Sequence, residues 1–229
     1  VRAGGEPGAA DVLDAAPGRL RVRLDGAAVD ATWSADVPWP RTRAFGGLGP
    51  AQAVPSLGQH WHPHLLLGAA RGSVTLGGVA TSLDGATVYA EKNWGSAFAG
   101  HWWWGQAHGL GDGAACVAFA GRRLLGQAPT ALVVALDGEL LRLSPPLSAV
   151  TTSTAPGHWR IRAGGVVVEA EADPSAAHLL PVPVPAERRV VVRSAQQLAG
   201  RLAVTVRRSG RVHFRGETEL AGLERGVPA

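Results

Sequence analysis

Two-residue turns containing Gly and Asp recur along the chain, and each separates segments in which apolar and polar residues alternate. The first lies at Asp25-Gly26, between RLRVRL and AAVDATW. Such turns between period-2 segments are the strongest short-range signal for a β-hairpin. Five further turns of this kind follow: Gly77-Gly78, Asp84-Gly85, Asp137-Gly138, Gly164-Gly165 and Ser209-Gly210. Consecutive hairpins predict an all-β, antiparallel up-and-down barrel.

Three segments depart from this pattern. The segment over residues 37–59 is a long connection, and a connection of that length is often a lid or a crossover. The Pro-rich segment over residues 173–187 is expected to be extended. One short helix is predicted over Ser194–Gly200, which reads SAQQLAG.

Composition limits the class of protein. The chain has 229 residues, of which 46% are hydrophobic, with 31 Gly and 16 Pro, so it can bury a core in one large or two small β domains. The net charge of +4 is spread along the strands rather than gathered in a patch, so no nucleic-acid partner is expected. Cys116 is expected to be a small buried hydrophobe.

The chain carries no signal for a membrane span or for secretion. Its apolar runs are shorter than the roughly 18 to 20 residues that cross a bilayer. The first residues have neither a basic start nor an apolar h-region, so they do not form a signal peptide. We therefore expect a cytoplasmic protein, with peripheral membrane contact as a further expectation and an unknown oligomeric state.

The window VYAEKNWGSAFAGHWWWGQAHG gathers rare side chains. It contains the chain's one tyrosine, Tyr89, its one lysine, Lys92, and four of its eight tryptophans. If YAEKNWG is a strand, Tyr89, Glu91 and Asn93 share one face, whereas Lys92 and Trp94 share the other.

Glu91 then has two interpretations. If its face points into the barrel, burial in an apolar cavity favours the neutral carboxylic acid, and Glu91 is an acid near pH 7. Alternatively, Glu91 pairs with Lys92 or with an arginine in a structural salt bridge. The alternation alone favours neither.

A histidine cluster lies upstream in QHWHPHLL, over residues 59–66. Its members are two apart and would share one face of a strand, opposite Trp61. They are His60, His62 and His64. Imidazole suits Zn, Fe and Cu, but no Cys, Asp or Glu cluster with ligand spacing accompanies the histidines. A polar wall that orients a ligand is therefore favoured, and no metal is expected.

The segment HWWWGQAHG predicts an aromatic wall. Trp102 and Trp104 share one strand face with Gln106, and Trp103 takes the other face. Such rings offer large apolar contact areas and attract cations. Core packing is the alternative for at least one of the three. The chain has no phosphate loop, no GxSxG elbow and no nucleotide fingerprint.

The segments WHPH, YAEKNWG and WWWGQ, followed by the terminal GETELAGLERG, resemble in their order the tocopherol cyclase family, from about Trp33 to the end of the chain. The resemblance implies a lipocalin- or calycin-like fold with two packed β-barrel domains. The FEGWY-type motif that opens family chains is absent, so the first barrel is expected to be incomplete. We expect residues 1–58 to form a partial β region with its connection, and residues 59–229 to form the barrel that carries the motifs.

The resemblance also implies a reaction, the closure of a chromanol ring from a prenylated hydroquinone, which needs no cofactor. An acid protonates the alkene, a π-rich wall tolerates the tertiary cation, and another group takes the phenol proton. The residues assigned to catalysis are Glu91, as the acid, with His62, His64, Tyr89 and Asn93. The residues assigned to substrate binding are Trp61, Trp94, Trp102, Trp104, Gln106 and Lys92.

Two other functions fit the same residues. One is a non-catalytic, lipocalin-like carrier of an isoprenoid quinone or another lipid, which needs the aromatic wall but no buried acid. The other is a hydratase or isomerase that acts on a polyene and uses the same acid with water. The ligand in each case is a small hydrophobic isoprenoid.

Overall fold

The computed structural model describes residues 2–4, 12–42, 44–54, 57–96, 100–111, 113, 115–145, 150–184 and 188–226. In these ranges the regular structure is antiparallel β-sheet, and two short 3-10 helices are placed in full, η1 (Gly49–Ala53) and η3 (Pro174–Ala176). The predicted all-β antiparallel fold is confirmed. No helix in the described part of the chain is long and apolar enough to span a membrane.

Contacts between Cα atoms divide the chain into two compact units. The first comprises residues 1–38 and 67–90, and the second comprises residues 39–66 and 91–229. The units are interleaved in the sequence, because β6 (Gln59–Leu76) and β8 (Thr87–Gly95) each run from one unit into the other. The division of the chain at residue 58 stays a prediction.

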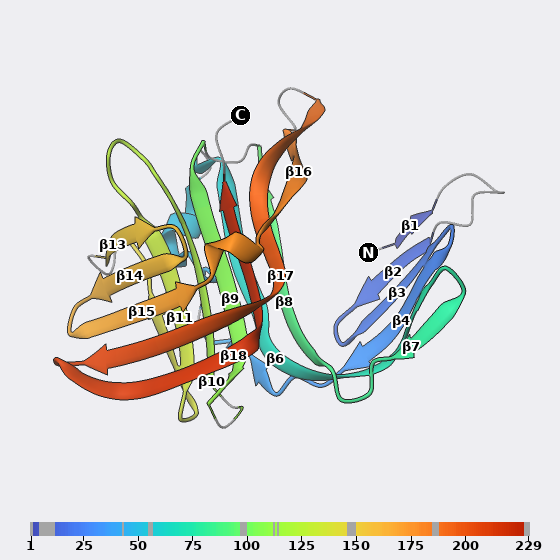
Figure 1. Ribbon diagram of the computed structural model, residues 1–229, viewed down its shortest axis with the longest axis horizontal. Helices are drawn as coiled ribbons and strands as arrows, with labels where there is room; N and C mark the ends of the chain where they lie inside the picture. Colours follow the sequence, from blue (N-terminus) through green and yellow to red (C-terminus); the bar gives the residue numbers. More distant parts are fainter. Residues whose placement is uncertain are drawn as a thin grey trace. The chain divides into compact units, whose positions relative to one another are not determined.

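The first unit is a series of hairpins (Figure 1). Besides parts of β6 and β8, its strands are β1 (Arg2–Gly4), β2 (Val12–Ala16), β3 (Arg19–Leu24), β4 (Ala27–Trp33), β5 (Val37–Pro38) and β7 (Val79–Ser82). β2, β3 and β4 pair in that order, and β4 pairs with the second half of β6. An ion pair of 3.0 Å from Arg21 to Asp30 links β3 to β4 at the surface.

The second unit contains a sheet of ten strands within the described ranges. The order is β12-β11-β10-β9-β18-β17-β15-β14-β13, with β16 beside β17. The bounds are β9 (Trp102–Leu110), β10 (Ala115–Arg122), β11 (Thr130–Leu136), β12 (Glu139–Leu143), β13 (Val150–Ala155), β14 (His158–Ala163), β15 (Val166–Ala172), β16 (His178–Val184), β17 (Arg189–Arg208) and β18 (Arg211–Gly226). The sheet is curled (Figure 1), and its β13 end lies close to β11. There the Thr152 hydroxyl of β13 donates a hydrogen bond to Thr130 Oγ1 of β11 at 2.7 Å.

All six predicted turn dipeptides lie at turns. The turn between β11 and β12 places both of its residues in the left-handed region, Asp137 at φ 52° and Gly138 at φ 75°. Asp and Gly tolerate this conformation better than most residues, which is why the dipeptide identifies the turn in the sequence.

The prediction of a helix over Ser194–Gly200 is wrong, because these residues belong to β17. The segment is paired with β18, and the register shifts between Gln197 and Gly200 as in a β-bulge. Strand partners on both sides, β16 and β18, supply hydrogen bonds that override the local helix preference of Gln, Leu and Ala. The Pro-rich segment is extended over β16, as expected, and residues 185–187 lie outside the described residues.

The inner face of the curled sheet carries the hydrophobic core. Phe119 of β10 and Trp159 of β14 are buried, and their ring centroids lie 5.3 Å apart across the interior. Trp103 belongs to the same cluster. Glycine is required at position 105, because a Cβ there would lie 2.4 Å from the Phe119 ring. The chain's own side chains thus pack the inside of the sheet.

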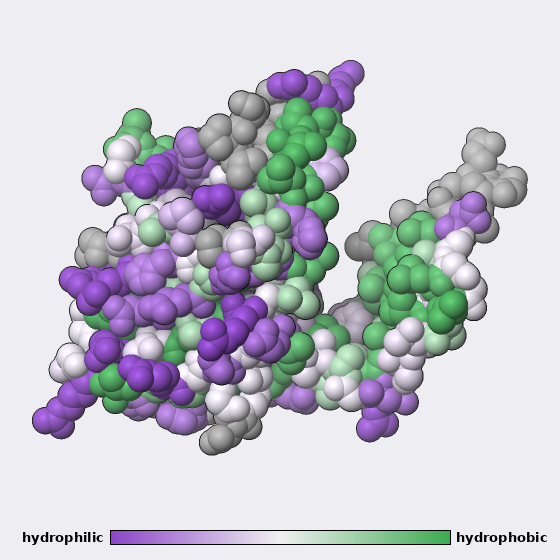
Figure 2. Space-filling model, viewed as in Figure 1, coloured by the Kyte–Doolittle hydropathy of each residue, from purple (hydrophilic) through white to green (hydrophobic). Residues whose placement is uncertain are grey.

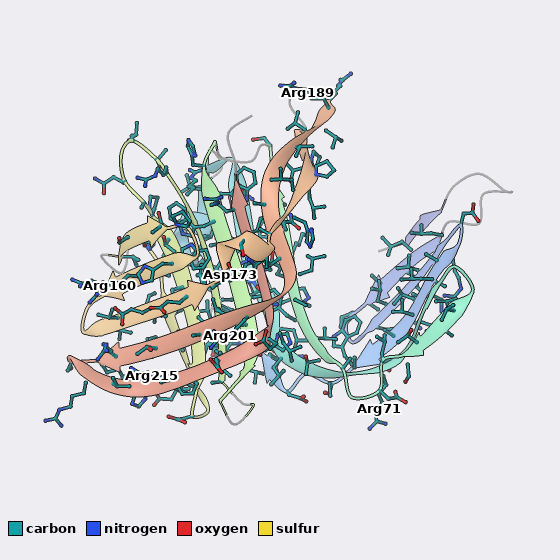
Figure 3. The ribbon with its side chains drawn as sticks, in the orientation of Figure 1. Arg71, Arg160, Asp173, Arg189, Arg201 and Arg215 are labelled. Carbon is teal, nitrogen blue, oxygen red and sulfur yellow. The ribbon has the colours of Figure 1, made fainter. Side chains whose placement is uncertain are left out.

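The outer face of the same sheet has a charged part. On β14, β15, β17 and β18, Arg160 and Glu169 pair at 3.0 Å, and Arg201 pairs with Glu217. Figure 3 shows Arg160, Arg201 and Arg215 on these strands, and Figure 2 shows that this region is hydrophilic. This part of the outer face is an ordinary solvent-exposed surface.

The outer face over β9 to β12 is covered instead. The long connection packs there, since Arg142 Nη1 of β12 donates to the carbonyl of Ala44 at 2.6 Å and Arg122 Nη1 of β10 donates to the carbonyl of Leu57 at 2.8 Å. Cys116 of β10 is buried, as expected, and its burial raises the pKa of its thiol to about 11. The connection therefore shields a second apolar surface of the sheet.

Candidate functional site

A cavity of about 360 Å³ lies within the second unit, between the ten-stranded sheet and the segments that cover it, which are the long connection and parts of β6 and β8. Leu48, Ala51 and Leu57 of the connection and Trp61 of β6 line the covering side. The sheet side includes Trp102 and Trp104 of β9, Ala120 and Arg122 of β10, and Ala131 of β11. The volume is that of a small-molecule site, for which roughly 300 to 1,000 Å³ is usual.

The Glu91 carboxylate is the most heavily bonded polar group on this wall. Its Oε2 accepts hydrogen bonds from the indole Nε1 of Trp61 at 2.7 Å and of Trp104 at 2.8 Å. Its Oε1 accepts from Nδ2 of Asn93. Three elements, β6, β8 and β9, thus fix the position of one carboxylate, and the predicted shared face of Glu91 and Asn93 is present in the structure.

Glu224 of β18 is a second carboxylate on the cavity wall. Its Oε1 accepts from Nε1 of Trp102 and from the hydroxyl of Ser194, both at 2.9 Å. Glu224 lies opposite Trp104 in the register between β18 and β9, so the two side chains share a face. The site therefore holds two carboxylates, each bonded to indole N–H groups.

The three consecutive tryptophans separate by strand alternation, as predicted. Trp102 and Trp104 share a strand face with Glu224, whereas Trp103 belongs to the core cluster, and all three residues line the cavity. Glycine is needed at position 226 because a Cβ there would lie 2.2 Å from the Trp102 ring. The core-packing alternative therefore holds for Trp103.

The three histidines do not converge on one point. His60 is buried and stacks on Trp94, with ring centroids 5.2 Å apart. His62 contacts Trp39 edge to face at 5.4 Å, and its ring centroid lies 6.3 Å from that of His64. None of the three lines the cavity. The described residues contain no group of three or more His, Cys, Asp or Glu side chains that could hold a metal ion.

Two of these imidazoles are biased toward the neutral form. Burial lowers the pKa of His62, and the neighbouring His64 lowers it further. Desolvation also lowers the pKa of His64, while the charge of Glu91 acts in the opposite direction. Both rings are therefore uncharged at neutral pH and can accept or donate a hydrogen bond.

Four further predicted site residues, three assigned to binding and Tyr89 assigned to catalysis, lie outside the cavity lining. Trp94 is 40% exposed, and Lys92 Nζ lies 5.3 Å from its ring centroid, on the opposite strand face from Glu91. Gln106 is buried, and its Oε1 lies 3.0 Å from Nδ1 of His108. Tyr89 belongs to the first unit by its contacts.

Sequence reasoning missed three polar residues that belong to the site, Glu224, Ser194 and Arg122. Glu224 is far from Glu91 in the sequence, and only the pairing of β18 with β9 brings it to the cavity. The one local signal is weak: Glu224 follows the apolar run of residues 220–223, whereas Glu217 and Glu219 alternate with threonine. Ser194 was assigned to a helix, which hid its strand face.

The geometry can be compared with known proteins. The model of the family described as tocopherol cyclase-like matches residues 35–227. The chain belongs to this family. A curated relative described as a probable chloroplastic tocopherol cyclase of Oryza sativa subsp. japonica is 28% identical over 118 residues. That match covers 48% of this chain and 25% of the relative, so the chain spans about a quarter of the relative's length.

One solved structure can be set beside this tocopherol cyclase-like chain. It is a protein of Nitrosomonas europaea assigned as an AttH protein, with 16% sequence identity and a TM-score of 0.46. The alignment covers 93% of this chain and 67% of that chain.

Proposed function

We propose that the cavity binds a prenylated hydroquinone and closes it to a chromanol by protonating the alkene and adding the phenolic oxygen. Membership of the tocopherol cyclase-like family supports this class of reaction. The observation that carries the proposal is the Glu91 carboxylate, fixed by two indole N–H groups on the wall of an apolar cavity.

A carboxylate is costly in a site that only stores a lipid. Removing a charged group from water is unfavourable unless hydrogen bonds compensate, and three donors are committed to Glu91 here. A carrier gains nothing from this arrangement, whereas acid–base catalysis requires a proton-transfer group that touches the ligand. The arrangement therefore favours an enzyme over a carrier.

Glu91 is the proposed acid, and Asn93 supports both of its protonation states. The side-chain amide of an asparagine donates through Nδ2 to an ionised carboxylate. After a flip of the amide group, it accepts through Oδ1 from a protonated carboxyl group. Both indole N–H groups bind the other oxygen, Oε2, and can remain in place in either state. The proton is therefore carried on Oε1.

The faces of Trp61, Trp102 and Trp104 are the proposed stabilisers of the tertiary cation. A cation over an indole face gains roughly 0.5 to 2 kcal/mol, and more when water is excluded. Trp102 is buried and Trp61 is 3% exposed, so these faces are shielded from water. His62, His64, Tyr89, Gln106, Lys92 and Trp94 stay predicted site residues, and no step of the reaction is routed through them.

The test is incubation of the purified protein with a prenylated dimethyl-hydroquinone, followed by chromatography for the chromanol. Wild type is expected to form chromanol, and Glu91→Gln is expected to be slower by about 10² to 10⁴ because it keeps the shape of the side chain but removes the proton. Glu219→Gln is the matched control, since Glu219 is exposed on β18.

Three results would redirect the proposal. Full activity of Glu91→Gln would remove Glu91 from the reaction. Tight binding without any product, seen as quenching of tryptophan fluorescence, would favour the carrier, for which the apolar lining of the cavity is the supporting observation. Product with an added hydroxyl from a polyene would favour a hydratase.

A further inference from the structure

Glu224 is a second carboxylate on the cavity wall, and the reaction proposed above leaves it without a role. Its Oε1 accepts the indole N–H of Trp102 and the hydroxyl of Ser194. Trp102 is 5% exposed and Ser194 is fully buried. Within the described residues, no hydrogen bond reaches the other oxygen, Oε2. A side chain this firmly anchored at one oxygen keeps the other available to a ligand.

The position of Glu224 relates it directly to Glu91. It lies opposite Trp104 in the register between β9 and β18, and the Trp104 indole donates to Glu91. Both carboxylates therefore neighbour the same indole ring. The titratable side chains that line the cavity, among the described residues, are Glu91, Glu224 and Arg122, and Arg122 directs Nη1 to the carbonyl of Leu57.

We infer that Glu224 is the catalytic base that accepts the phenolic proton of the ligand, while Glu91 donates the proton to the alkene. The inference rests on the proposed function and adds a second carboxyl to it. Glu224 lines the cavity, and its Oε2 is an acceptor that a phenolic O–H in the cavity can reach.

The step balances with these two groups alone. The phenolic O–H bond breaks and an O–H bond forms at Glu224. The O–H bond of Glu91 breaks and a C–H bond forms at the alkene carbon, and the phenolic oxygen bonds to the tertiary carbon. The reaction is neither an oxidation nor a reduction. Return of the proton from Glu224 to Glu91 through solvent resets the pair.

The first test compares chromanol formation by Glu224→Gln and Glu91→Gln across pH under anaerobic conditions. Glu224→Gln is expected to lose about 10² or more in kcat near pH 7. Its defect should shrink as the pH approaches that at which a phenol ionises by itself, about 10, because the base is then unnecessary. The defect of Glu91→Gln should not shrink, and Glu219→Gln should match wild type. A pH-independent defect of Glu224→Gln, or none, overturns the inference.

The second test measures binding and needs no turnover. Tryptophan quenching is compared for a prenylated hydroquinone and for its methyl ether, in which the reacting phenol oxygen carries a methyl group. Wild type should prefer the free phenol by roughly 10-fold, as expected for a hydrogen bond to a charged group. Glu224→Gln should lose this preference, and Ser194→Ala, which keeps the carboxylate, should retain part of it.

The two tests separate the two proposals. If wild type forms no chromanol, the cyclase proposal and the base role fail together, and loss of the phenol preference in Glu224→Gln then shows only that Glu224 accepts a hydrogen bond from the phenol. If wild type is active and Glu224→Gln keeps both its rate and its preference, the inference fails while the proposed function stands. Thermal unfolding of each variant shows whether it is folded, and Ser194→Ala replaces Glu224→Gln if the latter is not.

Discussion

The two faces of β9 differ in what they contact. The inward residue Trp103 belongs to a core that includes Phe119 and Leu132, both fully buried. The outward residues Trp102 and Trp104 donate hydrogen bonds to carboxylates. Because alternate residues of a strand point to opposite faces, one short segment serves two purposes. Residue parity on β9 therefore separates the packed core from the candidate site, which lies outside the curled sheet.

The largest expected effect is on stability and comes from the inner face. Phe119→Ala should lower the free energy of unfolding by about 3 to 5 kcal/mol, because it leaves a cavity in a fully buried site. Urea-induced unfolding measures the loss. Phe119→Leu keeps most of the volume and should cost less. A loss below about 1 kcal/mol for the alanine variant would show that the inner face is not the core.

The next effect should be on activity and comes from the outer face. Trp104→Phe keeps an aromatic ring but removes one N–H donor to Glu91, so activity should fall roughly 10- to 100-fold. Trp103→Phe is the matched control on the same strand, since no hydrogen-bond partner reaches Trp103 Nε1 within the described residues. Chromanol formation measures both rates. Equal rates for the two variants would contradict the assignment of activity to the outer face of β9.

A smaller effect is expected where the backbone supports the site. Gly226→Ala should displace the Trp102 ring, and overpacking of this kind costs about 1 to 3 kcal/mol. Activity should fall several-fold because Trp102 also binds Glu224. Gly100→Ala is the control, since a Cβ there meets no atom within 4 Å. Thermal unfolding measures the change in stability, and initial rates measure the change in activity. If Gly226→Ala and Gly100→Ala have the same melting temperature and rate, the packing of the Trp102 ring on Gly226 is contradicted.

The smallest effect is a pH dependence of stability. Burial lowers the pKa of His62 and of His108 from the ordinary 6.5. Below pH 6.5 the unfolded chain takes up protons that the folded chain does not, so stability is full above that value and falls as the pH is lowered. The thermal midpoint should drop by a few degrees between pH 7 and pH 5. His108→Gln should reduce the drop, and an unchanged drop would assign it to other groups.

The hairpins were readable from the sequence because their signals are local. Asp137-Gly138 adopts the turn that its residues favour, and the alternation in YAEKNWG places Glu91 and Asn93 together. Strand parity likewise separated Trp103 from its neighbours. These features depend on residues within a few positions of one another, so a single sequence contains enough information to predict them.

The rest depends on long-range pairing. Alternation gives two faces but does not say which one the curled sheet encloses, and only the structure places Glu91 at a cavity on the outer face. Glu224 reaches that cavity through the pairing of β18 with β9. Ser194 was misassigned because the partners of β17 override its local preference. The histidines share a strand yet contact different neighbours.

The central claim is that the ligand occupies the outer-face cavity bounded by Glu91, Trp104 and Glu224. A crystal structure of the protein with a bound prenylated hydroquinone tests it most directly. We expect the aromatic ring of the ligand to lie against Trp104, with a phenolic oxygen within hydrogen-bond distance of Glu224 and the alkene beside Glu91. A ligand bound among Phe119 and Trp159, inside the curled sheet, would contradict it.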